Sequence, residues 1–207
     1  MYVAWAGIVP RMEKRYDREY FDRWYRHGDI GGRQRLARKV ALAVATAEYH
    51  LERPLRSVLD VGCGEGAWRA PLLKLRPKLQ YLGFDSSEYA ITRYGRSRNL
   101  HFARFADFEQ LRPCPPVDLL VCSDVLHYLP ARELDRGLPG LAELCGGVAF
   151  LETFGREDQA EGDEHDFKQR PATFYRRRFE AAGFRQLGSH CWLSPAIAPA
   201  ATALEAS

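Results

Sequence analysis

The stretch VLDVGCGEG at residues 58–66 constrains the fold of this 207-residue chain more than any other. A short apolar run leads into three glycines at alternate positions, Gly62, Gly64 and Gly66, and a helix-like segment follows. Glycine lets the backbone adopt positive φ and lets a ligand approach the main chain closely. The first N–H groups of a helix also point towards whatever lies beyond them. The stretch therefore predicts a strand, a tight turn and a helix N-terminus that face a ligand.

Segments typical of strands and of helices alternate along most of the chain. The predicted strands are residues 57–61, 79–84, 99–104, 117–122 and 147–153, with one more beginning at Phe184, and the predicted helices are residues 33–51, 66–75, 87–95, 131–144 and 171–182. Such alternation requires a mostly parallel sheet with helices on both faces and right-handed crossovers. We therefore expect an α/β protein with a Rossmann-like, doubly wound sheet, in one domain over residues 33–194.

The segments on either side of this domain differ from it in composition. Residues 1–32 are rich in aromatic side chains, among them Tyr20, Trp24 and Tyr25, at spacings typical of one face of a helix. Such a helix either packs its rings on the domain or forms a lid in which Tyr20 and Tyr25 contact the ligand. Residues 195–207 form an alanine-rich tail.

The overall composition excludes several classes of protein. Hydrophobic residues make up 46% of the chain and charged residues 28%, which is ordinary for a soluble globular protein. A net charge of +3 is too small to indicate nucleic acid as a partner. No apolar run approaches the ~20 residues of a membrane-spanning helix, and the five cysteines include no C-x-x-C pair. We expect a cytoplasmic protein with reduced thiols, no zinc site and no contact with a membrane.

The side chains that follow the predicted strands indicate what the glycine turn holds. In a doubly wound sheet the ligand lies beyond the carboxyl ends of the strands. Asp85 closes the second strand, about 20 residues beyond the turn, where a carboxylate accepts hydrogen bonds from both hydroxyls of a ribose. Asp85 therefore predicts a ligand that contains adenosine, without distinguishing a dinucleotide from another cofactor.

Three details count against a pyrophosphate at the turn. The glycines follow the pattern G-x-G-x-G and not the G-x-G-x-x-G of dinucleotide-binding turns. Asp60 stands just before the turn, and a carboxylate is unfavourable beside a pyrophosphate but favourable beside an ammonium or sulfonium group. No tyrosine has a lysine four residues later, so the acid–base pair of short-chain dehydrogenases is missing.

These stretches together resemble a known family. V-L-D-V-G-C-G-E-G, followed in order by G-F-D-S-S, A-D-F and D-L-L-V-C-S-D-V-L-H-Y-L, is similar to the class I S-adenosylmethionine-dependent methyltransferases over roughly residues 33–190. The resemblance implies that the cofactor is S-adenosylmethionine. The residues that it implies for cofactor binding are Asp60, Gly62, Cys63, Gly64, Asp85, Ser86, Asp107, Phe108, Ser123 and Asp124.

The resemblance also implies what each end of the cofactor contacts. The glycine turn would lie against the methionine part, with Asp60 hydrogen-bonded to its amino group, and Asp85 would take the ribose hydroxyls. Asp107 and Phe108 would meet the adenine. Ser123 would line the site near the sulfonium, together with the residue that follows it.

The C-terminal end of the chain departs from the family pattern. The family usually ends in a β-hairpin whose last strand runs antiparallel in the sheet. Here only residues 184–192 indicate a strand, and Ser194-Pro195 follow. The final antiparallel strand is therefore undecided from the sequence.

Few residues are candidates for catalysis or acceptor binding. Methyl transfer from a sulfonium is an in-line displacement that needs a base only when the nucleophile arrives protonated. His127 follows the fourth strand and is a candidate general base, but its apolar neighbours are equally compatible with a histidine packed beneath the next helix. Residues 155–170 are rich in acidic side chains around His165 and form either a solvated loop or a lid over the acceptor.

We therefore expect an enzyme that moves a methyl group to O or N of a small-molecule acceptor without a metal. Arg176, Arg177 and Arg178 fan around a helix at about 100° per residue, so they do not form a single patch for nucleic acid. A protein or RNA methyltransferase and a module that binds S-adenosylmethionine without catalysis are the alternatives, and an NAD oxidoreductase is the least favoured. The oligomeric state is not indicated.

Overall fold

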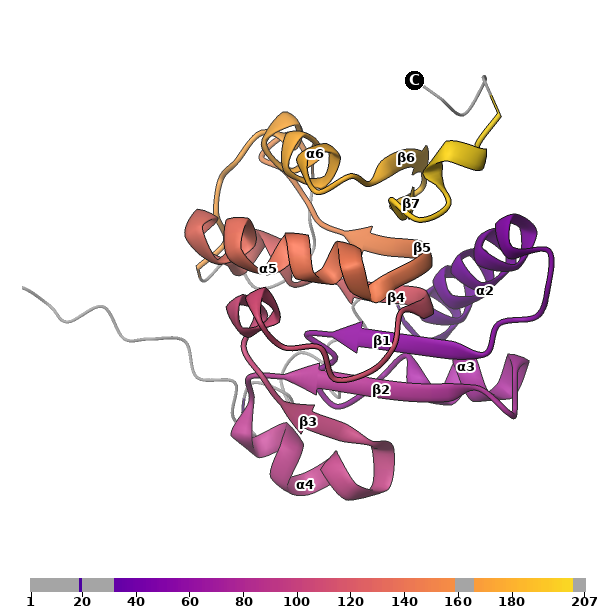
Figure 1. The fold of residues 1–207 in the computed structure, drawn as a ribbon. Helices are drawn as coiled ribbons and strands as arrows, with labels where there is room; N and C mark the ends of the chain where they lie inside the picture. Colours follow the sequence, from indigo (N-terminus) through magenta and orange to yellow (C-terminus); the bar gives the residue numbers. More distant parts are fainter. Residues whose placement is uncertain (1–18, 20–31, 159–165, 203–207) are drawn as a thin grey trace, which may run out of the picture.

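In the part of the chain that the structure describes, a seven-stranded sheet is covered by helices on both faces (Figure 1). The structure is a computed structural model, and it describes residues 32–158 and 166–202 together with Glu19. The strands are β1 (Ser57–Val61), β2 (Gln80–Asp85), β3 (Leu100–Phe102), β4 (Val117–Ser123), β5 (Cys145–Glu152), β6 (Arg185–Gly188) and β7 (Cys191–Leu193). The helices are α2 (Gly32–Leu51), α3 (Arg69–Leu75), α4 (Glu88–Arg98), α5 (Ala131–Leu144) and α6 (Ala172–Ala181), and the short 3₁₀ helices are η2 (Phe105–Glu109), η3 (Leu126–Tyr128) and η4 (Ala198–Ala200). The predicted α/β architecture is confirmed.

The order of the strands places the switch point of the sheet beside β1. The order is β3-β2-β1-β4-β5-β7-β6, so the chain runs outward from β1 to β3 and then returns to the other side of β1 with β4. The first five strands pair in parallel, and β7 pairs antiparallel with both β5 and β6. In sheets of this class the ligand lies beyond the carboxyl ends of the strands at such a point.

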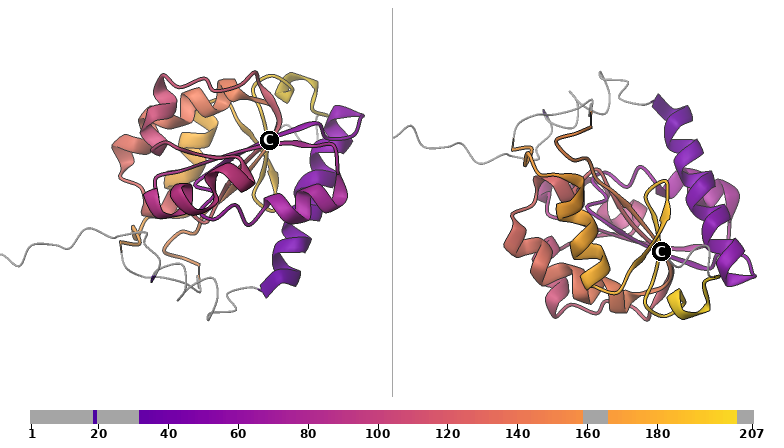
Figure 2. Two further views of the ribbon diagram at one scale, coloured as in Figure 1. Left: turned by 90° about the horizontal axis from the view of Figure 1, so that it is seen from below. Right: turned by 90° about the horizontal axis from the view of Figure 1, so that it is seen from above.

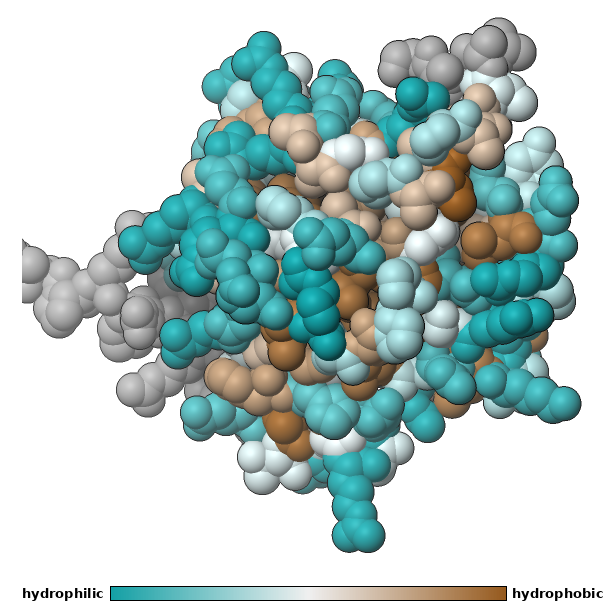
Figure 3. All heavy atoms as spheres, in the orientation of Figure 1, coloured by the Kyte–Doolittle hydropathy of each residue, from teal (hydrophilic) through white to brown (hydrophobic). Residues whose placement is uncertain are grey.

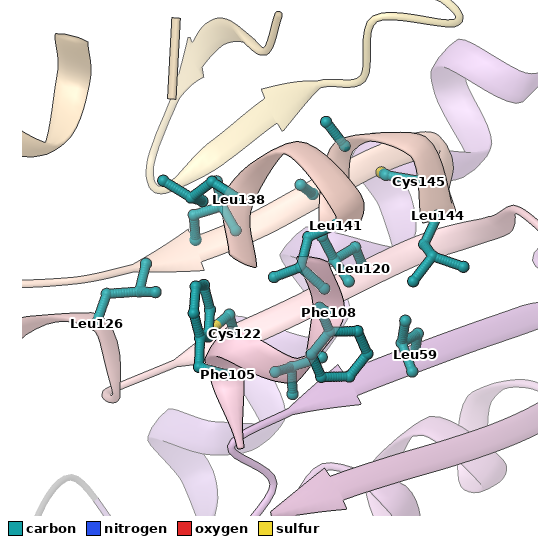
Figure 4. Close-up of a cluster of buried hydrophobic side chains, with 14 of the residues drawn as sticks. Leu59, Phe105, Phe108, Leu120, Cys122, Leu126, Leu138, Leu141, Leu144 and Cys145 are labelled. Atoms are coloured by element: carbon teal, nitrogen blue, oxygen red, sulfur yellow. The ribbon is translucent and has the colours of Figure 1, made fainter. Parts of the chain in front are cut away.

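Alternate residues of each strand enter different cores, because successive side chains point to opposite faces. Leu59 and Leu120 belong to the core beneath α5, which Figure 4 shows in close-up. Val58 and Leu119, their neighbours in sequence, belong to the core beneath α2 and α3. Figure 2 shows these helix layers on opposite sides of the sheet.

A β-hairpin completes the sheet at its C-terminal end, so the undecided antiparallel strand is present. Instead of one strand over residues 184–192, two short strands form, and β7 lies between β5 and β6. Ser189 and His190 form the turn between them with φ of 48° and 66°. The sequence signals this turn weakly, because neither residue is the glycine or asparagine that usually occupies this left-handed conformation.

Most of the face seen in Figure 3 is hydrophilic, with hydrophobic residues in small groups between polar ones. The large hydrophobic side chains that are exposed among the described residues are Leu42, Tyr49, Leu75 and Phe102. Scattered exposed hydrophobic residues are normal in folded proteins. None of the helices in the described ranges is long and apolar enough to cross a membrane.

Two glycines bring α5 into close contact with η2. Gly137 and Gly140 are three residues apart, so they lie on one face of the helix. A Cβ at Gly140 would lie 1.8 Å from the carbonyl oxygen of Phe108, and a Cβ at Gly137 would lie 2.4 Å from that of Phe105. Neither distance leaves room for a side chain. The contact holds both phenylalanine rings in the core beneath α5 (Figure 4).

Gly140→Ala should therefore destabilise the fold. The added methyl group meets backbone atoms that cannot rotate away, and overpacking of this kind costs about 1–3 kcal/mol or more. Denaturation in urea should show a lower midpoint at an unchanged slope. Gly146→Ala is the control, because its Cβ would lie 3.3 Å from the nearest atom and should cost less. Equal stability of the two variants would contradict the close contact.

Candidate active site

Backbone hydrogen bonds to β2 close the glycine turn after β1. The N–H of Gly62 donates to the carbonyl of Phe84 at 2.8 Å. Gly62, Gly64 and Gly66 have φ of 74°, 53° and 77°, in the left-handed region that favours glycine. Because Gly66 still belongs to the turn, the next helix begins at Arg69 and not at residue 66 as the sequence predicted.

Gly62 also contacts the connection that follows β4. A Cβ at Gly62 would lie 2.4 Å from Cγ2 of Val125, so only glycine fits at this point. The main chain of the turn therefore packs directly against the segment after β4. This contact joins the two strands whose carboxyl ends form the switch point.

Asp85, the last residue of β2, links the glycine turn to the start of α4. Its Oδ2 accepts a hydrogen bond from the N–H of Gly64 at 2.7 Å, and its Oδ1 accepts one from the N–H of Ser87 at 2.8 Å. Ser86, between them, is exposed. Burial raises the pKa of Asp85, and the N–H donors act in the opposite direction. Each carboxylate oxygen has two lone pairs, so both oxygens can still accept a ribose hydroxyl.

Asp60 is buried beneath the turn and is hydrogen-bonded to Tyr81. The Tyr81 hydroxyl donates to Oδ2 of Asp60 at 2.7 Å. Burial raises the pKa of Asp60 to about 7, the Tyr81 hydrogen bond opposes the rise, and the charge of Asp85 adds to it. Burial and the same two carboxylates raise the pKa of the Cys63 thiol, so it is unsuited to act as a nucleophile. An approaching cation would favour the ionised form of Asp60.

The buried Asp60 should make stability depend on pH. Its pKa in the folded chain, about 7, exceeds the ~4 of an exposed aspartate. The folded state therefore holds an extra proton between these values, and this group lowers the free energy of unfolding as pH rises through them. Asp60→Asn keeps an acceptor for Tyr81 without the charge.

Urea denaturation at several pH values measures this contribution. The free energy of unfolding of Asp60→Asn, minus that of the original chain, should increase from about pH 4 to about pH 8. Taking the difference cancels the other titrating groups. A difference that stays constant over this range would show that Asp60 ionises as an exposed carboxyl group does.

The two residues expected at the adenine lie in different surroundings. Asp107 is exposed in η2, and its Oδ2 accepts a hydrogen bond from the N–H of Arg104 at 2.8 Å, which caps this short helix. Phe108 is fully buried, with its ring edge-on to that of Phe84 at 5.5 Å between centroids. The core beneath α5 takes up this large apolar side chain, so contact between Phe108 and the adenine stays a prediction that its ring does not support in this structure. Contact between Asp107 and the adenine stays a prediction.

An ion pair at the carboxyl ends of β4 and β5 joins Lys39 and Glu152, neither of which is among the site residues that the family resemblance implies. Ser123 and Glu152 are neighbours across the two strands, and the Ser123 hydroxyl donates to Oε2 of Glu152 at 2.5 Å. Nζ of Lys39, from α2, lies 2.5 Å from Oε1 of the same carboxylate. The available signals are a lysine beside the buried face of α2 and a glutamate at the end of an apolar strand.

His127 lies in η3, just beyond β4, and only 1% of it is exposed. Its Nε2 lies 3.3 Å from Oδ1 of Asp124, and its Nδ1 lies 3.4 Å from Oγ1 of Thr153. Asp124 has φ of 63° and turns the chain at the end of β4. Three aromatic rings contact the imidazole, those of Tyr128, Phe154 and Phe167. The histidine is thus packed, and its action as a general base stays a prediction.

Some of the predicted contacts with the acceptor cannot be placed. Tyr20, Tyr25 and His165 lie outside the described residues, so a lid formed by them stays a prediction. Within the described ranges, no group of three or more histidine, cysteine, aspartate or glutamate residues is arranged to hold a metal ion.

The ion pair between Lys39 and Glu152 should contribute to stability because the carboxylate of Glu152 is almost inaccessible. Lys39→Met leaves the carboxylate of Glu152 without its cation, and breaking a buried pair in this way costs about 3–5 kcal/mol. The double variant Lys39→Met/Glu152→Gln should recover most of this loss. The measurement is the urea midpoint, and a double variant no more stable than the single one would contradict a role for charge.

The matched control is Arg53→Met, because Arg53 pairs with Asp118 towards the other end of β4. The exposed fractions of the side chains are 34% and 10% in this pair, against 27% and 2% for Lys39 and Glu152. Since Asp118 is less buried, its loss of a partner should cost less than that of Glu152.

Several known proteins resemble this chain. A family model described as a methyltransferase domain matches residues 59–147. Trans-aconitate 2-methyltransferase from Deinococcus radiodurans is 32% identical over 156 residues, which cover 73% of this chain and 57% of that protein. The protein of the same name from Methylobacterium nodulans is 36% identical over 84 residues, or 41% of this chain and 32% of that protein. The chain spans less than two thirds of the length of these curated relatives.

Solved structures share the fold at low sequence identity. The sugar N-methyltransferase KedS8 from Streptoalloteichus has a TM-score of 0.62 at 17% identity, over 89% of this chain and 90% of that one. Magnesium protoporphyrin IX methyltransferase from Synechocystis, solved with bound SAH, has a TM-score of 0.58 at 20% identity, over 86% of this chain and 94% of that one. At these identities the likeness concerns the fold alone.

Proposed function

Since this chain belongs to the class I S-adenosylmethionine-dependent methyltransferases, we propose that it transfers a methyl group to a carboxylate oxygen of a small organic acid. The observation that carries the proposal is the glycine turn held against Asp85 at the switch point of the sheet. This arrangement places a stretch of main chain without side chains and a fixed carboxylate together at the carboxyl ends of the strands.

The residues at this edge fit S-adenosylmethionine. Both oxygens of Asp85 retain a lone pair for the ribose hydroxyls, and the buried Asp60 suits the ammonium group because the two opposite charges stabilise each other. A bound cofactor would supply an activated methyl group on its sulfonium, whose transfer to the acceptor oxygen would leave the C–S electron pair on sulfur. The chain then has to hold the acceptor in line with that bond.

A carboxylate acceptor fits the packed state of His127. Carboxylic acids are ionised at neutral pH, so their methylation needs no general base. His127 can then remain held by Asp124 and Thr153, as the structure has it. An alcohol acceptor would instead require a base with access to the nucleophile.

Two further observations support an acidic acceptor. The curated relatives are named for trans-aconitate, a carboxylic acid. Around the ends of β4 and β5, Lys39 pairs with Glu152 and Lys168 pairs with Asp166. Arg170 is the remaining cation there for which the described residues provide no ion-pair partner.

Calorimetry with S-adenosylhomocysteine tests the cofactor site. The original chain should bind it, and Asp85→Asn should bind about 10- to 100-fold more weakly, because hydrogen bonds to a charged group contribute about 1.5–3 kcal/mol. Asp135→Asn is the control, because Asp135 is an exposed residue of α5 and belongs to neither the glycine turn nor the end of β2. It should leave the affinity unchanged. No binding by the original chain at hundreds of micromolar would overturn the proposal.

A transfer assay with methyl-labelled cofactor tests the acceptor atom. Label transferred to a carboxylate forms a methyl ester, which alkali hydrolyses to labelled methanol, whereas N-methyl and ether products keep the label. With trans-aconitate as the probe, we expect label that alkali releases. Alkali-stable label would point to N or alcohol O, and label confined to macromolecules in a cell extract would point to a protein or RNA acceptor.

A further inference from the structure

Arg170 is a cation without an ion-pair partner among the described residues. It lies just before α6, and its Nη1 is buried from solvent and makes no hydrogen bond. A guanidinium group keeps its charge at any physiological pH. Since buried donors in folded proteins almost always have an acceptor, this group is suited to an anion that comes from outside the described chain.

Tyr175 presents a second unsatisfied donor next to Arg170. Its hydroxyl is also buried and makes no hydrogen bond of normal geometry, although the side chains of Arg170 and Thr153 lie close enough to interact with it weakly. Burial raises the pKa of Tyr175, while Arg170 and Thr153 are close enough to lower it. An N–H and an O–H donor side by side match the two oxygens of one carboxylate.

These two donors lie on the acceptor side of the site. Thr153 directly follows β5, and its Oγ1 lies 3.4 Å from Nδ1 of His127. Arg170 and Tyr175 neighbour Thr153 in turn. They therefore belong to the carboxyl ends of β4 and β5, where the methyl group would be transferred.

Phe174 holds the guanidinium group of Arg170 in place. The guanidinium carbon of Arg170 lies 4.5 Å from the centroid of the Phe174 ring, and that of Arg178 lies 3.7 Å from the same centroid. Stacking of this kind favours guanidinium groups and limits their orientation. The two arginines differ in one respect: Arg178 pairs with Asp135 at 2.8 Å, whereas Arg170 has no such partner within the described ranges.

We infer that Arg170 and Tyr175 bind a carboxylate of the acceptor that is not the one methylated, so that the preferred acceptor is a di- or tricarboxylic acid. This inference rests on the proposed function. Binding the second carboxylate would satisfy both buried donors and would orient the first carboxylate towards the methyl group.

A merely structural Arg170 would behave differently. If Arg170 served only to pack on Phe174, replacing it would lower stability and leave binding unchanged. Replacing a ligand-binding Arg170 by Gln removes the same stacking contact and also weakens acceptor binding. A loss of affinity in Arg170→Gln that Arg178→Gln does not show therefore identifies a binding residue, because Arg178→Gln also loses a contact with the Phe174 ring.

Calorimetry on the full chain saturated with S-adenosylhomocysteine tests the inference, with trans-aconitate as the probe. Arg170→Gln should weaken its binding about 10- to 100-fold, and Tyr175→Phe, which removes only the hydroxyl, should weaken it about 5-fold. Arg178→Gln is the matched control, because it changes an arginine on the same ring that already has its anion. Its affinity should equal that of the original chain.

A second ligand separates the two carboxylate positions. Crotonate has one carboxylate and no second group for Arg170, so Arg170→Gln should leave its weak binding unchanged. Equal affinities of Arg170→Gln and Arg178→Gln for trans-aconitate would overturn the inference. So would a chain that binds S-adenosylhomocysteine but not trans-aconitate, whereas failure to bind S-adenosylhomocysteine would overturn the proposed function itself.

Discussion

The contact between the main chain of Gly62 and the side chain of Val125 holds the two halves of the site together. β1 and β4 are hydrogen-bonded only over residues 58–60 and 119–121, and beyond their ends the chain leaves the sheet. At that point a Cβ on Gly62 would lie 2.4 Å from Val125, so the glycine turn and the segment after β4 meet without a gap. The relative positions of Asp85, which we expect to hold the ribose, and Ser123, on the proposed acceptor side, depend on this contact.

Three carboxylates are gathered at the same edge of the sheet, and each is compensated differently. Asp85 accepts hydrogen bonds from two backbone N–H groups. Glu152 has the ammonium group of Lys39 and the hydroxyl of Ser123. Asp60 has only the Tyr81 hydroxyl among the described residues, so it is the carboxylate whose charge is least compensated. A cationic ligand group therefore gains most beside Asp60, which agrees with an ammonium group at that end of the cofactor.

Some parts of the site were predictable because they depend on neighbours in sequence. The turn over Gly62 to Gly66 follows from three glycines after an apolar strand, and Asp85 follows from its place at the end of the next strand. The helix over residues 131–144 has the bounds that its pattern predicts. Other parts depend on packing between distant segments. The sequence does not show that the close approach of α5, which Gly140 permits, encloses the ring of Phe108 in the core.

The charged residues on the proposed acceptor side were also not predictable from the sequence, because they come together only in the folded chain. Lys39 and Glu152 are far apart in the sequence, and neither position indicates by itself that the two side chains form an ion pair. Arg170 similarly belongs to a charged stretch, and only its position beside Tyr175 and Phe174 distinguishes it from Arg178. The sequence did not predict the hairpin of β6 and β7, because its turn is formed by Ser189 and His190 and not by the residues typical of such turns.

By itself, the sequence determined the α/β fold, the glycine turn and the carboxylate expected to hold a ribose, because backbone conformation and alternation along the chain are local properties. The tertiary structure decided which charges are buried together, which rings enter the core and which donors lack partners. Those features depend on the distance between side chains brought together by the sheet, and electrostatic and packing energies depend on that distance rather than on position in the chain.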